Sequence, residues 1–497
     1  MTGKPFHNPL LEYGLGQGVL LQKGEDGVWL LMKYPLKAVR FHPDVGPLLE
    51  CLAQDGLLPL NKLSSMAPQL GEVGLQQFLN SLVRKGFVQI SGTAALNCCP
   101  MVSIIIPVRN RPDQIDSCLD SLQRLNYPSD RLEIIVVNDG SDDGLTSEVV
   151  SGSPVRLMEL SEQRGASYCR NLGASQANGK ILAFVDSDCR VDPDWLYELI
   201  PAFEDPALAA VGGLVDGVRS RTSLDRYEKV RSSLFLGKLW KRSVEQDHSF
   251  YVPSCNLLTS RNAFVEVGGF RQDLEVGEDV DLCWRLQDMG KILEYRPQGA
   301  VAHMHRNSLI GFAGRRFKYG TSEPLLQSLH PGRRKTMVWP PKVIIFWLLL
   351  ASGLSFSSPA LLGLGLLLPL VQAWQQQRVL QGQGVNISLG RVLAGVLRSR
   401  LAFAYLLCSF LSRYWLLWAL PLLPIWPGAA VFFIAVQLLV GVVEYRVCRP
   451  RLWLPVFIFL LTVEQCAYQA GVWYGCWTSR CFGPLNPKLV IFGRGGD

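Results

Sequence analysis

The feature that most constrains this chain is a long apolar region in its C-terminal third. No charged side chain occurs from residue 343 to 377, and Arg413 is the only charged residue from 401 to 443. A helix needs about 20 apolar residues to cross a bilayer, so both runs are long enough for at least one span. A third run, 452–477, contains Glu464, which also permits a helix that lies in the interface. We expect about four membrane segments within 340–477, with five or two as alternatives.

Basic residues cluster beside these apolar runs and predict which side the rest of the chain occupies. The clusters fall at 333–335, 391–400 and 446–451, and the net charge of the chain is +7. Lys and Arg accumulate in the cytoplasmic loops of membrane proteins, so we expect a multi-pass or peripheral-helical protein of the cell membrane whose domain at 100–330 faces the cytoplasm. The clusters flank membrane segments and do not indicate a nucleic-acid surface. The 13 cysteines follow no disulfide framework and are expected to be reduced thiols.

Residues 14–91 carry the pattern of a small separate module. Two apolar runs surround Gly24-Glu25-Asp26-Gly27, which predicts a β-hairpin. Two helical patterns follow, and Gly86 is expected to end the second. This order predicts a winged-helix-like module. No cluster of acids, histidines or glycines within it indicates catalysis, so a docking or structural role is expected.

A different architecture begins after residue 100. The stretches VSIIIPV (102–108), LEIIVVND (132–139) and KILAFVD (180–186) are typical of buried strands, with helical patterns between them. This alternation predicts an α/β domain with a parallel sheet over 100–330. Ligands bind beyond the carboxyl ends of parallel strands. The acids of NDGS (138–141) and DSD (186–188) are therefore expected at one edge of the sheet.

These three acids, Asp139, Asp186 and Asp188, suggest a cation site. Carboxylates that lie close together repel each other unless a cation or hydrogen-bond donors offset them. Mg²⁺ and Mn²⁺ bind carboxylate oxygens and share their sites with substrate phosphates. A polar turn remains the alternative interpretation, because Asp is common in turns.

A second acidic cluster, Glu278 and Asp279, lies at the start of a predicted helix. Acids are favoured there by the helix dipole, so capping alone is one interpretation. A carboxylate that accepts a proton from a substrate hydroxyl is the other. Further along, His303 and His305 are two residues apart. A structural role is expected for such a pair, but we keep His305 as a candidate diphosphate or metal contact.

Six motifs give a resemblance over about residues 100–310. VSIIIPVRNR, IIVVNDGSDD, RGASYCRNLGA, LAFVDSDCRVDPDWL, VGGF and GEDVDLCWRL occur in the order found in family 2 inverting glycosyltransferases of the Rossmann-like GT-A fold. The resemblance implies that Asp279 is the catalytic base and that Glu278 supports it. It also implies a Mg²⁺ or Mn²⁺ ion on Asp188. The nucleotide-sugar contacts that it implies are Pro107, Arg109, Asp139, Arg170, Asp186 and Asp188.

The helix expected after this domain differs from that of the processive synthases of the same superfamily. Those enzymes carry a Gln-x-x-Arg-Trp motif, whereas this chain has GRRFKYGTSEP at 314–324. Arg315, Arg316 and Tyr319 are expected to do related work. A cellulose- or hyaluronan-type polymerase is disfavoured.

The order of all these parts resembles the mycofactocin-type glycosyltransferases, which carry an N-terminal PqqD-like domain. PqqD-like domains bind precursor peptides by adding a strand to a hairpin edge. The resemblance implies transfer of glucose from UDP-glucose to a peptide-derived acceptor. Transfer to polyprenyl phosphate or another lipid is one alternative, and a noncatalytic membrane scaffold for a peptide is another.

Overall fold

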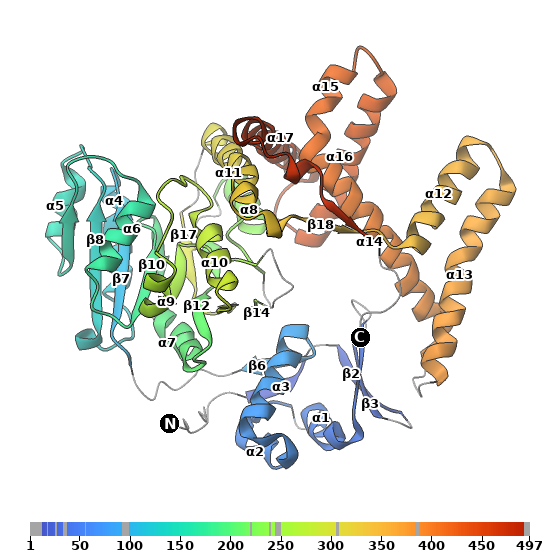
Figure 1. The fold of residues 1–497 in the computed structure, drawn as a ribbon, viewed down its shortest axis with the longest axis horizontal. Helices are drawn as coiled ribbons and strands as arrows, with labels where there is room; N and C mark the ends of the chain where they lie inside the picture. Colours follow the sequence, from blue (N-terminus) through green and yellow to red (C-terminus); the bar gives the residue numbers. More distant parts are fainter. Residues whose placement is uncertain are drawn as a thin grey trace. The chain divides into compact units, whose positions relative to one another are not determined.

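The computed structural model describes residues 12–16, 18–24, 27–32, 37–54, 56–91, 99–218, 221–237, 240–243, 250–304, 308–382 and 387–491 (Figure 1). The chain forms two compact units, which are described separately. The first comprises residues 1–92, 335–411 and 486–497, and the second comprises 93–334 and 412–485.

An eight-stranded mixed sheet forms the centre of the second unit, in the order β14-β16-β12-β15-β10-β7-β8-β9. Strands β10, β7, β8 and β9 are parallel, as the sequence predicts, whereas β15 runs antiparallel to both of its neighbours, β10 and β12. The strands are β7 (Val102–Val108), β8 (Leu132–Asn138), β9 (Arg156–Glu159), β10 (Ile181–Val185), β12 (Leu208–Gly212), β14 (Lys241–Arg242), β15 (Asn256–Ser260) and β16 (Ile292–Tyr295).

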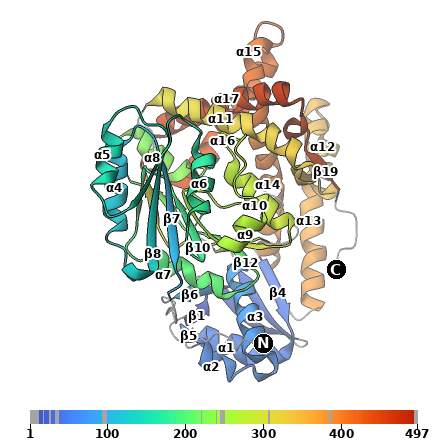
Figure 2. The same cartoon turned by 60° about the vertical axis from the view of Figure 1, so that its left-hand side comes forward.

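Helices cover both faces of this sheet (Figure 2). On one face, Ile115, Cys118 and Leu122 of α4 are buried, at the three- and four-residue spacing of one side of a helix. On the other face, Cys169 of α6 and Leu282 of α10 join a separate core. The helices of the domain are α4 (Pro112–Leu122), α5 (Leu145–Ser151), α6 (Ala166–Ser175), α7 (Trp195–Leu199), α8 (Ser223–Arg231), α9 (Arg261–Glu266), α10 (Glu278–Asp288) and α11 (Leu309–Leu329).

A small second sheet brings distant segments to the edge where β10 ends. It consists of β11 (Cys189–Val191), β17 (Val301–His303) and β13 (Val215–Gly217). Strands β11 and β17 are antiparallel, and their register places Cys189 opposite His303. The turn after β10 therefore meets a strand more than a hundred residues away.

Apolar helices complete the second unit. They are the end of α14 (Leu389–Trp415), α15 (Ala419–Leu422), α16 (Pro427–Cys448) and α17 (Leu454–Ser479). Helix α17 packs so closely on α11 that a Cβ added to Gly471 would lie 2.0 Å from the carbonyl oxygen of Phe317. Glycine is required at this contact because any side chain would displace one backbone from the other.

The first unit contains the N-terminal elements together with the helices α12 (Pro341–Ser355), α13 (Pro359–Gly382) and most of α14. The predicted hairpin is present, since Gly24 pairs with Gly27. Trp29 and Leu31 of this hairpin are buried with Ala373 of α13 and Val392 of α14. The N-terminal elements are β1 (Glu12–Leu15), β2 (Val19–Gly24), β3 (Gly27–Met32), β4 (Lys37–Phe41), α1 (Gly46–Gln54), β5 (Leu58–Pro59), α2 (Leu60–Ser64), α3 (Gly71–Lys85) and β6 (Val88–Ser91).

Three helical segments are long and apolar enough to cross a membrane, among the residues described. They are Leu389–Leu422, Pro427–Cys448 and Leu454–Ser479, and the shorter α12 is also apolar. About four segments were expected from the sequence, and the difference arises because the apolar run that begins at 343 is divided between α12 and α13.

Candidate active site

Asp186 follows strand β10 directly, at the carboxyl end of the parallel strands. Its carboxylate accepts a hydrogen bond from Nη2 of Arg170 on α6, at 2.6 Å. Burial acts to raise the pKa of Asp186, but the charges of Arg170 and, less strongly, Arg315 outweigh it and hold the pKa below its usual range. Asp186 is therefore a carboxylate anchored to a neighbouring helix.

Arg170 joins two parts of the site that are far apart in the sequence. Its guanidinium is 3% exposed and also donates from Nη1 to Glu278 at 3.0 Å. The same group lies over the ring of Phe270, 5.3 Å from its centroid. The sequence predicts both acids but does not reveal that one arginine binds them together.

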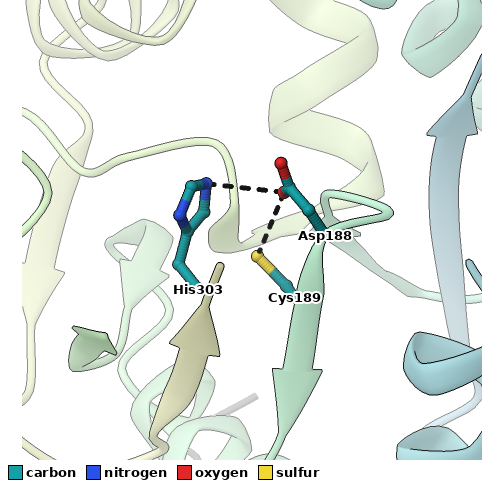
Figure 3. Close-up of side chains that lie close together, drawn as sticks. All are labelled: Asp188, Cys189 and His303. Atoms are coloured by element: carbon teal, nitrogen blue, oxygen red, sulfur yellow. Dashed lines mark hydrogen bonds and ion pairs between the residues drawn. The ribbon is translucent and has the colours of Figure 1, made fainter. Parts of the chain in front are cut away.

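Asp188 lies close to its neighbour Cys189 and to His303 of β17 (Figure 3), and it also contacts Arg111 of a third segment. Nη1 of Arg111 lies 2.7 Å from Oδ2 of Asp188, and Nε2 of His303 lies 3.4 Å from Oδ1. The ligand atoms of Asp188, Cys189 and His303 all lie within 4.8 Å of one another. Burial raises the pKa of the Cys189 thiol well above its usual value, so the thiol stays protonated. Asp188 and His303 offer an oxygen and a nitrogen to a candidate metal ion, and carboxylate oxygen is the donor suited to Mg²⁺ and Mn²⁺.

Asp139 lies beyond the end of β8 and is 5% exposed. Its Oδ1 accepts a hydrogen bond from the backbone N–H of Arg164 at 2.6 Å, and Oδ2 accepts one from that of Gly165 at 3.0 Å. The carboxylate fixes the loop that leads into α6. Asp139 therefore positions the helix that carries Arg170.

Glu278 and Asp279 form the first turn of α10, after Gly277 in a left-handed conformation. Asp279 is partly buried and accepts hydrogen bonds from the backbone N–H groups of Ser254, at 3.3 Å, and Val280, at 2.8 Å. Burial and the charge of Glu278 raise the pKa of Asp279 to about 7. A carboxyl group with a pKa near neutrality can exchange a proton under physiological conditions.

Asp281, the third acid of this motif, has a structural role. It is fully buried and lies 2.7 Å from Nη2 of Arg285 and 2.9 Å from Nε2 of His330. Asp281 therefore fixes α10, whereas Glu278 contacts Arg170 and Asp279 contacts Ser254 at the start of this helix.

The two arginines predicted in the region of α11, Arg315 and Arg316, contact different partners. The charge of Arg315 acts on Asp186, and its Nε donates to the hydroxyl of Tyr319 at 3.1 Å. Arg316 is buried and binds Glu228 of α8 at 2.8 Å. Arg315 and its partner Tyr319 therefore belong to the surroundings of Asp186, whereas Arg316 is paired with α8.

Two further predicted residues, Pro107 and Arg109, lie near the end of β7 and directly after it. Pro107 is buried within β7. Arg109 contacts Gln163 and the carbonyl oxygen of Gly140 at the edge near Asp139. His305 lies outside the described residues, whereas its neighbour His303 contacts Asp188.

The sequence patterns do not indicate Arg111 or Ser254 as site residues. They also led us to expect His305, rather than His303, as a metal or diphosphate contact. The pairing of β11 with β17 selects His303, and no local pattern shows that register. Arg111 had one signal, since it lies in the same VRNRP stretch as Arg109.

Comparisons with known proteins show what this chain is similar to. Residues 103–268 match the family model described as Glycosyl transferase family 2. The "Pre-mycofactocin glycosyltransferase" of Mycobacterium tuberculosis is 32% identical over 406 residues, covering 78% of this chain and 82% of that protein. "Glycosyltransferase AglE" of Haloferax volcanii is 30% identical over 203 residues, covering 39% of this chain and 64% of that protein.

Among solved structures, the mannosyltransferase PcManGT from Pyrobaculum calidifontis, in complex with GDP-Man and Mn²⁺, resembles 61% of this chain and 88% of its own, with 20% identity and a TM-score of 0.39. That TM-score is too low to carry an argument. The sequence matches and the α/β sheet confirm the predicted catalytic domain, which excludes a purely noncatalytic scaffold. On the extent and identity of its match to the M. tuberculosis protein, the chain belongs to the family 2 glycosyltransferases, in the group of the pre-mycofactocin glycosyltransferases.

Proposed function

We propose that this glycosyltransferase moves glucose from UDP-glucose to a peptide-derived acceptor in mycofactocin biosynthesis, with inversion at the anomeric carbon. The similarity to the M. tuberculosis enzyme over 78% of the chain supports the pathway. The observation that carries the chemistry is Arg170, which binds Asp186 and Glu278 at once. It holds the proposed donor acids and the proposed base within one site.

Asp279 is the proposed base. It accepts the proton of the acceptor hydroxyl as that oxygen attacks the anomeric carbon from the face opposite the diphosphate. The oxygen–carbon bond forms as the bond to the diphosphate breaks, so no covalent sugar intermediate on the protein is needed. Glu278 and Arg170 keep the base in position, and Arg111 and Arg315 offset negative charge on the departing nucleotide.

A divalent cation fits the residues at the end of β10. Asp188 offers carboxylate oxygen and His303 offers an imidazole nitrogen, a donor set suited to Mn²⁺. Mg²⁺ would use the carboxylate together with the diphosphate of the donor. When bound, the ion would neutralise charge on that diphosphate.

The N-terminal elements, residues 14–91, are proposed to bind the peptide part of the acceptor as a PqqD-like module. The β2-β3-β4 sheet has two edge strands, β2 and β4. An extended peptide can add to such an edge through backbone hydrogen bonds. The proposed cytoplasmic side for the catalytic domain rests on the basic clusters that flank the apolar helices.

The direct test is a donor and acceptor screen with mass spectrometry of the products. The proposal expects hexose to be added to a mycofactocin precursor from UDP-glucose in the presence of Mn²⁺ or Mg²⁺. Transfer to polyprenyl phosphate with no transfer to the peptide-derived acceptor would contradict it. A variant lacking residues 1–95 should still release UDP from UDP-glucose but lose selectivity for the peptide-derived acceptor.

A further inference from the structure

Helix α17 is long and apolar enough to cross a bilayer, yet it packs along the catalytic domain over most of its length. Near its start, the buried ring of Phe457 lies 5.3 Å from the ring of Tyr227 on α8. Near its end, a Cβ added to Gly475 would lie 2.6 Å from the carbonyl oxygen of Thr321 on α11. Both ends of α17 therefore rest on the same α/β domain.

Polar groups along α17 point toward that domain as well. Glu464 is 6% exposed and accepts a hydrogen bond from the hydroxyl of Tyr227 at 2.6 Å. Arg231 lies 3.9 Å from Glu464 and 2.9 Å from Glu444 of α16. These contacts bind α16 and α17 to α8 through buried charges. A carboxylate paired in this way does not face lipid.

Solvent-exposed ion pairs involve both of the helices, α8 and α11, against which α17 packs. On α8, Lys229 is 49% exposed and lies 3.6 Å from Asp216. On α11, Lys318 is 50% exposed and contacts Glu275. Exposed ion pairs remain in water because their transfer into hydrocarbon is costly. Both ends of α17 must then lie on one aqueous side, whereas a spanning helix has its ends on opposite sides.

The outward face of α17 is apolar and aromatic. Trp and Tyr are enriched where a protein meets the membrane interface. The most exposed large side chains on this face are Phe459 (56%), Tyr474 (58%) and Trp477 (80%), and Trp453 (78%) directly precedes the helix. Such a helix fits a position in the plane of the interface, with its aromatic face toward the lipid.

The hairpin formed by the end of α14, α15 and α16 reaches beyond α17 (Figures 1 and 2). Gln437 of α16 donates to Thr462 of α17 at 2.9 Å, and from there α16 extends about ten residues, or roughly 15 Å, to its start at Pro427. The tip side chains Leu420, Ile425 and Trp426 are 71%, 79% and 67% exposed. A reach of about 15 Å covers half of a hydrocarbon core of about 30 Å.

We propose that the catalytic unit, residues 93–334 and 412–485, binds one leaflet of a lipid bilayer and does not cross it. Helix α17 lies in the interface, and the tip at 419–426 enters the hydrocarbon of the near leaflet. No charged residue occurs from 414 to 443, so this hairpin can enter lipid without burying a charge. The bilayer thus binds two apolar surfaces of this unit, which are the outward face of α17 and the tip at 419–426.

Site-directed labelling tests this topology in the full-length chain. Single variants carry a new thiol at exposed positions before α17 (Arg451→Cys), after α17 (Phe482→Cys) and at the tip (Ile425→Cys), with Arg190→Cys marking the catalytic domain. Right-side-out and inside-out membrane vesicles are each treated with a membrane-impermeant maleimide. Mass spectrometry then identifies the modified peptides. The native cysteines remain, because fragmentation of each peptide distinguishes the new thiol from a native neighbour such as Cys189 or Cys481. Labelling requires no turnover, so its outcome is independent of the proposed substrates.

The proposal expects Arg451→Cys and Phe482→Cys to be modified from the same face as Arg190→Cys. It expects Ile425→Cys to be protected in both orientations and to react after detergent is added. Modification of Arg451→Cys and Phe482→Cys from opposite faces would show that α17 spans and would overturn the proposal. Modification of Ile425→Cys from either face in intact membranes would overturn the insertion of the tip. A thermal unfolding midpoint close to that of the unmodified protein checks that each variant is folded.

Discussion

Replacing Arg170 with methionine should destabilise the catalytic unit strongly. The side chain is 3% exposed and makes charged hydrogen bonds of 2.6 Å to Asp186 and 3.0 Å to Glu278. Methionine fills similar space but leaves both carboxylates without their cation. Breaking a buried ion pair by removing one partner costs about 3–5 kcal/mol. At roughly 2–4 °C per kcal/mol for a domain of this size, the unfolding midpoint should fall by about 6–20 °C.

The assay is thermal unfolding of the detergent-solubilised protein, followed by intrinsic fluorescence. The matched control is Arg190→Met, because Arg190 is exposed and donates to Ser117 at 3.0 Å. An exposed contact of this kind is worth less than about 1 kcal/mol. The double variant Arg170→Met/Asp186→Asn should regain part of the loss, since one of the unpaired charges is gone. Equal midpoints for Arg170→Met and Arg190→Met would refute the bridging role of Arg170.

Three further predictions concern the metal, the helix contact and the pH dependence. His303→Ala should raise the Mn²⁺ concentration needed for half-maximal activity by at least about tenfold, in a metal titration at saturating donor; an unchanged value would remove His303 from the site. Gly471→Ala should lower the unfolding midpoint, because its Cβ would meet the Phe317 carbonyl oxygen and overpacking of this kind costs about 1–3 kcal/mol. Gly314→Ala is the control and should leave the midpoint unchanged, because nothing lies within 4 Å of a Cβ there. The transfer rate should rise with pH up to about 7, the pKa of Asp279, because the base acts when deprotonated; a rate that is flat from pH 5 to 8 would contradict this.

Local sequence patterns predict much of the catalytic domain. The strands at 102–108, 132–138 and 181–185 were expected because their apolar runs are continuous, which is typical of strands buried on both faces. The position of Asp186 at the end of β10 follows from that pattern. These features depend on residues close together in the chain, where periodicity and turn residues are informative.

The connections between distant segments could not be predicted in this way. The pairing of Cys189 with His303 depends on the register of β11 with β17, and the double contact of Arg170 depends on how α6 packs against α10. Helix α17 shows the limit most clearly. Its length and hydropathy indicate a span, but its packing on Tyr227 and Thr321 is a tertiary property that composition does not record.

The central claim is that Asp279 is the base at a site that Arg170 holds together. The most direct measurement is the rate of glucose transfer by Asp279→Asn at saturating UDP-glucose, beside Asp273→Asn, whose carboxylate is 70% exposed. Loss of a general base should lower the rate about 10²- to 10⁴-fold, with donor affinity unchanged and the rate of Asp273→Asn normal.

Stability separates loss of the base from misfolding. The pKa of Asp279 is raised from 3.8 to about 7 in the folded protein, so the native state takes up a proton between these values that the unfolded state has released. The carboxylate therefore costs stability as the pH rises through this range, and above pH 7 Asp279→Asn should unfold at the same temperature as the unmodified protein or higher. A stable Asp279→Asn variant with a transfer rate within threefold of the unmodified enzyme would contradict the account.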